Sequence, residues 1–257
     1  MADTLYLSLW YPNLRLEAIP DKLTAVLGSF AAHGGEANVY AVTVWPVNWS
    51  EAPVFQRVYG RIGGVPESSP GAAPRQAVEE ALELLHDDYA YEFQIGWNLW
   101  ELEMDAGESV ARKATGDPHS TAPTAADSAQ GRLATMPLEE NAKIAAQDQK
   151  SSGLVSPRWV QGSRLVRVTA YGPLFDDGVY EQEGHIRIDF GSDAPFLEED
   201  ADLDRVGARH VEENVRQLVE LAAAIEKASG ATARLLWSEL GESLAQKLAE
   251  RLGIRNS

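Results

Sequence analysis

The sequence predicts an α+β protein built from two halves, and three observations support this. Hydrophobic residues make up 44% of the chain and charged residues 24%, the balance of a packed globular protein. Segments with apolar residues at every second position alternate with segments in which they recur at helical spacing. Apolar patterning then fades over residues 104–153. We therefore expect an N-terminal half at 1–103, a flexible linker at 104–153 and a C-terminal half at 154–257.

The elements of the N-terminal half follow from periodicity and turn residues. Leu5, Leu7 and Leu9 alternate with other side chains, as in a strand buried on one face. Pro20 suits the first turn of the next segment, a helix that the glycine pair at 34–35 ends. In chain order we expect strand 5–10, helix 19–30, strands 39–45 and 53–59, a helix after residue 74 and strand 91–102. This β-α-β-β-α-β order is that of ferredoxin-like sandwiches.

The C-terminal half predicts a second α/β sandwich. Residues 165–171 and 185–190 are typical of strands. Val211, Val215 and Leu218 recur at helical spacing and begin a long helix that Gly230 ends. A strand at 233–237 and an amphipathic helix at 240–252 complete the half, and a short helix is expected at 137–149 within the linker.

Composition and missing motifs exclude several classes of function. The chain has no cysteine, which removes disulfides, thiolate metal sites and cysteine nucleophiles. It contains no G-x-x-x-x-G-K, H-E-x-x-H or G-x-S-x-G motif, so we expect no catalytic residues, no metal and no cofactor. Neither a secretory signal nor a run of about 18 apolar residues occurs, which favours the cytoplasm and no membrane partner.

The formal net charge is −17. A charge of this size repels phosphate backbones, so direct binding of nucleic acid is not expected. It also steers basic proteins toward the chain and raises their association rate. Solubility alone would be a sufficient reason for the acidity, and the sequence leaves both interpretations open.

One predicted strand offers a pattern that could carry chemistry. Alternation would place Glu181, Glu183, His185, Arg187 and Asp189 on one face of it. A carboxylate beside a histidine can tune a general base or help to bind a metal. The simpler interpretation is a solvated strand face with ion pairs across strands.

The densest acidic run precedes the long helix. Its spacing begins like a calcium loop, but Arg205 replaces the turn glycine and Val211 replaces the closing glutamate. Acids at this place can also cap the helix and complement its dipole. A third interpretation is a docking patch anchored by Phe196 and Leu197. The acidic residues of the run are Glu198, Glu199, Asp200, Asp202 and Asp204.

Two further places are candidates for partner contacts. Asp87 and Asp88 follow the second helix, where carboxylates oppose the negative pole of its dipole. Trp49 lies in a short loop beside Glu51, and an exposed aromatic with an acidic neighbour is typical of an interface hot spot. We therefore predict a partner-binding set made of Trp49, Glu51, Asp87, Asp88, Phe196, Glu198, Glu199, Asp200 and Asp202.

Four features of this acidic chain belong together: Trp45 to Trp49, His185 to Phe190, Glu198 to Asp204, and Trp237, Ser238 and Glu239. Through them the chain resembles the immunity proteins that bacteria make against their own polymorphic toxins. The resemblance lies in amino-acid composition and covers both halves but not the linker. It implies a protein that covers a toxin, commonly a basic nuclease.

The first hypothesis is therefore a non-catalytic protein, monomeric or a small homo-oligomer, that inhibits a basic toxin with its acidic surface. An enzyme of hydrolase or metal-dependent type that uses the His185 face is one alternative. A secretion adaptor or structural protein is another.

Overall fold

A computed structural model describes residues 3–61, 71–104, 157–197 and 203–238, and it has the predicted α+β class. The strands are β1 (Thr4–Trp10), β2 (Gly35–Pro46), β3 (Phe55–Val58), β4 (Tyr89–Met104), β5 (Pro157–Tyr171), β6 (Ile186–Ser192) and β7 (Ala233–Ser238). The helices are α1 (Ile19–Ala32), α2 (Pro74–Ala81), α4 (Tyr180–Glu183), α5 (Ala194–Leu197) and α6 (Arg205–Ser229). Single 3-10 turns lie at Leu16–Ala18, Leu82–Leu84 and Phe175–Asp177. The expected helices at 137–149 and 240–252 lie outside the described residues.

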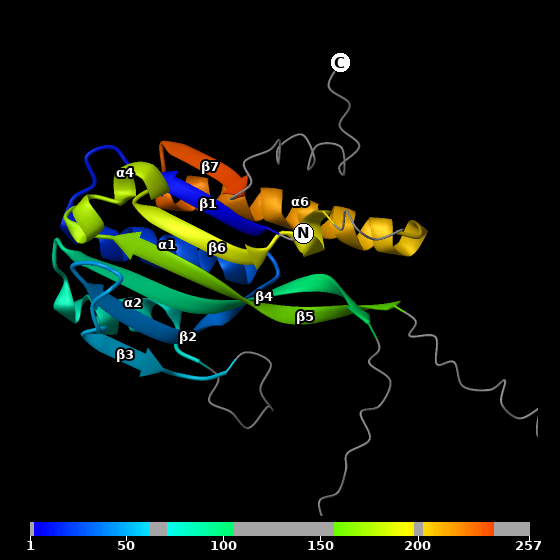
Figure 1. Cartoon of the computed structure of the whole chain (residues 1–257), viewed down its shortest axis with the longest axis horizontal. Helices are drawn as coiled ribbons and strands as arrows, with labels where there is room; N and C mark the ends of the chain where they lie inside the picture. Colours follow the sequence, from blue (N-terminus) through cyan, green and yellow to red (C-terminus); the bar gives the residue numbers. More distant parts are fainter. Residues whose placement is uncertain (1–2, 62–70, 105–156, 198–202, 239–257) are drawn as a thin grey trace, which may run out of the picture. The chain divides into compact units, whose positions relative to one another are not determined.

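The strands of both halves join in one seven-stranded sheet, with the order β3-β2-β4-β5-β6-β1-β7 (Figure 1). The prediction of two separate sandwiches is therefore wrong, and the described parts of residues 1–102 and 159–257 form one compact unit. The chain order β-α-β-β-α-β is present, but the ferredoxin-like sheet is not formed. That arrangement needs the first strand to pair within its own half. Here Leu7 of β1 lies opposite Ile188 of β6 and Leu236 of β7.

The buried side of the sheet explains why β1 pairs across the halves. Figure 1 shows α1, α2 and α6 gathered on one face of the sheet. Leu5, Leu7 and Leu9 are fully buried there, together with Ile188 of β6 and Leu218 of α6. By joining the sheet between two C-terminal strands, β1 lets one continuous core replace two small ones, which buries a larger fraction of the apolar surface.

The two ends of the sheet differ in construction. β1, β2 and β5 finish at one end, which we call the loop end, where the segments 11–15, 46–54, 85–88 and 172–178 lie (left in Figure 1). We call the opposite end the Arg164 end.

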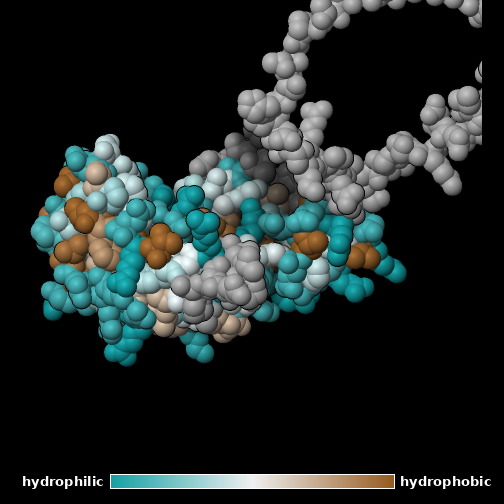
Figure 2. Space-filling model, turned by 90° about the horizontal axis from the view of Figure 1, so that it is seen from below, coloured by the Kyte–Doolittle hydropathy of each residue, from teal (hydrophilic) through white to brown (hydrophobic). Residues whose placement is uncertain are grey.

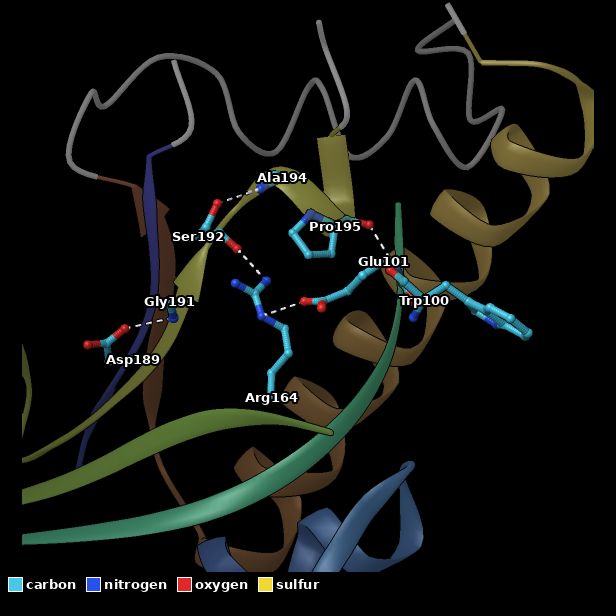
Figure 3. Close-up of polar contacts among 9 residues, drawn as sticks. Trp100, Glu101, Arg164, Asp189, Gly191, Ser192, Ala194 and Pro195 are labelled. Carbon is cyan, nitrogen blue, oxygen red and sulfur yellow. Dashed lines mark hydrogen bonds and ion pairs between the residues drawn. The ribbon is translucent and has the colours of Figure 1, made fainter. Parts of the chain in front are cut away.

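At the Arg164 end, one arginine joins three strands (Figure 3). Arg164 of β5 pairs with Glu101 of β4, with 2.8 Å between Nε and Oε1. It also donates a hydrogen bond to the carbonyl of Ser192 in β6, at 3.1 Å. Both charges are only partly exposed and each satisfies the other, so this contact fixes the strand ends without leaving an unpaired buried charge.

Asn214 connects α6 to the same end of the sheet. Its side chain is fully buried and accepts a hydrogen bond from the Trp100 N–H at 3.0 Å. It donates to the carbonyls of Trp100 and Pro195, each at 2.8 Å. The N-terminus of α6 is capped by Asp204, whose carboxylate accepts from the Gly207 N–H at 2.7 Å. Capping is one of the roles that the sequence suggested for this acidic run.

Within the described residues, no helix is both long enough and apolar enough to cross a membrane.

Candidate functional site

Three segments of the loop end are joined by backbone hydrogen bonds into one surface. The Val47 N–H donates to the Asp88 carbonyl, and the Asp176 N–H donates to the Val47 carbonyl, both at 2.7 Å. The Leu174 N–H donates to the Asp87 carbonyl at 2.8 Å. Segments 46–54, 85–88 and 172–178 therefore hold one another in place, and we call them together the acidic loop surface.

Close packing fixes this arrangement further. A Cβ atom placed on Gly172 would lie 2.3 Å from the carbonyl oxygen of Asp87, which no side chain can do without moving the backbone. The third segment can approach the second only because glycine stands there. This close contact restricts how segments 85–88 and 172–178 can lie against each other.

Backbone strain is concentrated in the acidic loop surface. Val47, Asp176 and Asp177 have φ of 57°, 45° and 55°, and they are three of the four non-glycine residues with positive φ in the described part of the chain. A β-branched residue in this region is a clear outlier. Such conformations cost on the order of 1–3 kcal/mol each and cluster at functional sites.

An aromatic base supports the surface. The Trp49 ring meets the rings of Trp45, Tyr171 and Phe175 edge-on, with centroids 5.7, 6.2 and 5.1 Å away. Tyr171 and Phe175 are fully buried, whereas Trp49 is 37% exposed. The indole is therefore held by neighbouring rings and is still partly open to solvent.

The surface carries negative charge and exposed apolar groups. Five carboxylates belong to it, those of Glu51, Asp87, Asp88, Asp176 and Asp177, and its three segments contain no lysine or arginine. The Asp88 carboxylate contacts the Nδ1 of the His86 ring. Leu174 is 64% exposed and Val47 48%. The left end of Figure 2, where the loop end lies, shows hydrophobic side chains set among hydrophilic ones.

The structure brings together part of the predicted partner-binding set. Trp49, Glu51, Asp87 and Asp88 all lie on the acidic loop surface. Sequence reasoning missed its third segment, which supplies Asp176 and Asp177. The pattern from Gly172 to Gly178, two glycines around a proline and two aspartates, is a strong turn signal that could have indicated it.

The predicted role of Phe196 is wrong. Its side chain is fully buried, and its ring stacks on that of Trp97 with centroids 5.8 Å apart. Leu197 is 5% exposed. These residues form the short helix α5 against α6, so their apolar character reflects core packing. The other members of the set, Glu198, Glu199, Asp200 and Asp202, lie outside the described residues.

The predicted alternation from Glu181 to Asp189 is also wrong. Glu181 and Glu183 belong to helix α4, because Gly184, with φ of 91°, turns the chain before β6 begins. The Glu183 carboxylate forms an ion pair with Arg187 and accepts a hydrogen bond from the Tyr171 hydroxyl at 2.8 Å. Among the described residues, no carboxylate forms a hydrogen bond or ion pair with His185.

The His185 ring is instead half-buried next to aromatic neighbours. Its Nδ1 accepts a hydrogen bond from the Tyr11 N–H at 3.2 Å, and the Tyr180 ring lies 4.7 Å from it between centroids. Burial lowers the pKa of His185 below its ordinary value. In the part of the chain that the structure covers, no group of three or more His, Asp or Glu side chains could hold a metal ion.

Comparison with family models, curated proteins and solved structures gave no match to this chain.

Proposed function

We propose that this chain is a non-catalytic binding protein that inhibits a basic protein, in the manner of a toxin immunity protein, through the acidic loop surface. The observation that carries the proposal is the combination, on one surface, of strained backbone, an anchored tryptophan and five carboxylates without lysine or arginine.

The charge supports a basic partner. Five carboxylates on three segments that contain no lysine or arginine of their own produce a local field that adds to the net charge of −17. Such a field accelerates association with a positive surface, and its effect falls as salt rises. A protein that binds phosphates must itself be positive, so a nuclease is a suitable partner class.

The aromatic base supports tight binding. Tryptophan is enriched among residues that contribute most to interface energy. Because Trp49 rests on Trp45, Tyr171 and Phe175, little side-chain entropy is left to lose when a partner covers it. Leu174 and Val47 add apolar contact area beside it.

The strained loops support a binding role over a purely solubilising one. Exposed acids that only keep a protein soluble need no fixed backbone. Here Val47 and Asp176 are held at positive φ by hydrogen bonds between segments. Strain that the surrounding structure enforces is typical of preorganised binding sites.

The test is co-expression with the products of the neighbouring reading frames. The partner is identified as a product that stops growth when it is expressed by itself but not when it is expressed together with this chain. The four-carboxylate variant, Glu51→Gln with Asp87→Asn, Asp176→Asn and Asp177→Asn, should lose the protection. It keeps Asp88, which contacts His86, and asparagine tolerates positive φ as aspartate does.

A matched control removes the same number of charges elsewhere. Glu79→Gln, Glu212→Gln, Glu220→Gln and Glu226→Gln change carboxylates on α2 and α6, outside the three segments of the acidic loop surface. This control should protect as the wild type does. Equal protection by both variants, or no neighbouring product that the chain neutralises, would contradict the proposal.

A further inference from the structure

A cavity of about 340 Å³ opens at the loop end beside the acidic loop surface. Its walls come from the segment after β1, the start of α1, the end of β5 and the turn before β6. The lining residues with polar side chains are Tyr11, Asn13, Arg15, Tyr171, Tyr180 and His185. None of the aspartates and glutamates that the structure describes lines it.

The imidazole in this cavity is set up as a donor. Its Nδ1 accepts the hydrogen bond from the Tyr11 N–H at 3.2 Å. A neutral imidazole has one accepting and one donating nitrogen, so the proton of His185 resides on Nε2. Burial lowers the pKa of His185, and the ring therefore stays in this neutral form near pH 7.

Arg15 adds a positive charge at the cavity. Its side chain is exposed and forms no ion pair with any residue that the structure describes. The other arginine of this region, Arg187, is already paired with Glu183. Arg15 is thus available to a ligand, and a guanidinium binds carboxylate oxygens better than any other side chain does.

The phenols leave the cavity without negative charge of its own. Burial raises the pKa of the Tyr11 hydroxyl to about 12, and it raises that of Tyr171 further. Both hydroxyls therefore stay neutral. Glu183, which accepts a hydrogen bond from the lining residue Tyr171, is already paired with Arg187.

The remaining wall is apolar and flat. Leu14, Leu16 and Ile19 line the cavity together with Pro173. The Tyr180 and His185 rings lie 4.7 Å apart between centroids and are tilted by 33° to each other. Aromatic faces in this setting favour a ring as the bound group.

We infer that this cavity binds a small aromatic monocarboxylate, with its carboxylate toward Arg15 and the Nε2–H of His185 and its ring against the tyrosines and the aliphatic wall. The inference does not depend on the proposed inhibitor role, since it uses none of the carboxylates of the acidic loop surface. The volume of the cavity suits such a ligand, because pockets for small molecules begin at about 300 Å³.

The test measures binding of benzoate and of its neutral analogue benzamide by ligand-observed NMR. A ligand of this size reaches a dissociation constant of about 1 mM when it fits well. Benzamide should bind about tenfold more weakly, because it lacks the charge that Arg15 pairs with. In a separate NMR spectrum of the protein, benzoate should also shift the ring resonances of His185.

Three variants assign the contacts. Arg15→Gln should weaken benzoate binding about fivefold or more and leave benzamide binding nearly unchanged. His185→Asn keeps an acceptor for the Tyr11 N–H but removes the ring donor, and it should weaken both ligands. Arg216→Gln, an equal change of charge on α6, should alter neither.

Any of three results would overturn the inference. Benzoate and benzamide could bind equally well, or benzoate could fail to bind at a concentration about tenfold above the expected dissociation constant. The third is an unchanged affinity for benzoate in Arg15→Gln. Because Arg15 is exposed, that variant remains informative even if His185→Asn fails to fold. Failure here would leave the inhibitor proposal intact, since the growth assay varies different residues.

Discussion

The two ends of the sheet stand in contrast. At the Arg164 end, opposite charges pair, and the buried amide of Asn214 satisfies three backbone groups. At the loop end, like charges gather and Val47, Asp176 and Asp177 hold unfavourable backbone conformations. One end has the construction expected of a stabilising region, and the other has features that stability alone does not explain.

The Arg164 end contains contacts that stabilise the fold, whereas the loop end presents side chains that a partner could contact. Contacts at the Arg164 end join β4, β5, β6 and α6, which come from both halves of the chain. Contacts at the loop end join backbone to backbone, so the side chains of Glu51, Asp87 and Asp177 are left to face solvent. Substitutions at the two ends should therefore have opposite consequences for stability and for binding.

The largest effect is expected at Asn214. Replacing it by leucine leaves the Trp100 N–H and two buried carbonyls without partners, which should lower the free energy of unfolding by about 3 kcal/mol or more. Urea unfolding measures this. Glu220→Gln, an exposed change on the same helix, should have almost no effect, and an equal loss in both would remove the special role of Asn214.

A smaller loss is expected at Arg164. Changing it to glutamine breaks the pair with Glu101 and the hydrogen bond to Ser192, at a cost of about 1–2 kcal/mol. Arg167→Gln is the control, since its ion pair with Asp189 is longer, at 3.3 Å, and half-exposed. If the control lost as much stability, the contacts of Arg164 would stabilise the protein no more than an exposed ion pair does.

At the loop end, a substitution should stabilise the protein. Val47→Gly relieves the positive φ of a β-branched residue, and we expect the free energy of unfolding to rise by up to about 1 kcal/mol. Val54→Gly, at a similarly exposed valine in the same loop without positive φ, should instead lose stability. Destabilisation by both changes would contradict strain at Val47.

The smallest effect concerns pH. The pKa of His185 lies below its ordinary value of 6.5 in the folded chain because the ring is buried. Between the lowered pKa of the folded chain and 6.5, the unfolded chain binds more protons than the folded chain does. The contribution of His185 to stability is therefore complete above pH 6.5 and declines as pH falls below it. In His185→Asn this part of the decline should vanish, as thermal unfolding at pH 5 and pH 7.5 would show. An unchanged pH dependence would exclude His185 as its source.

Local structure was largely predictable from the sequence, because it depends on nearby residues. The alternation around Leu7 and the helical spacing from Val211 to Leu218 both gave the correct element. The pairing of β1 with β6 and β7 was not predictable in this way. Both halves contain apolar strands, and periodicity does not say which strands become neighbours.

The candidate site was predictable only in part, for the same reason. Trp49, Asp87 and Asp88 could be selected singly, from a loop position and from charges unfavourable at a helix end. Their contact with segment 172–178 depends on the sheet order. Phe196 was misassigned because an apolar residue beside acids has the same sequence pattern whether it is buried or exposed.

The role of the acidic loop surface is best tested by the salt dependence of the association rate with the basic partner that co-expression identifies. For the wild type, we predict a rate that falls about tenfold or more as salt rises from low to high concentration. The four-carboxylate variant should associate slowly at low salt and respond weakly to salt, whereas the matched control should follow the wild type. A steep salt dependence that survives in the four-carboxylate variant would show that the acidic loop surface does not attract the partner.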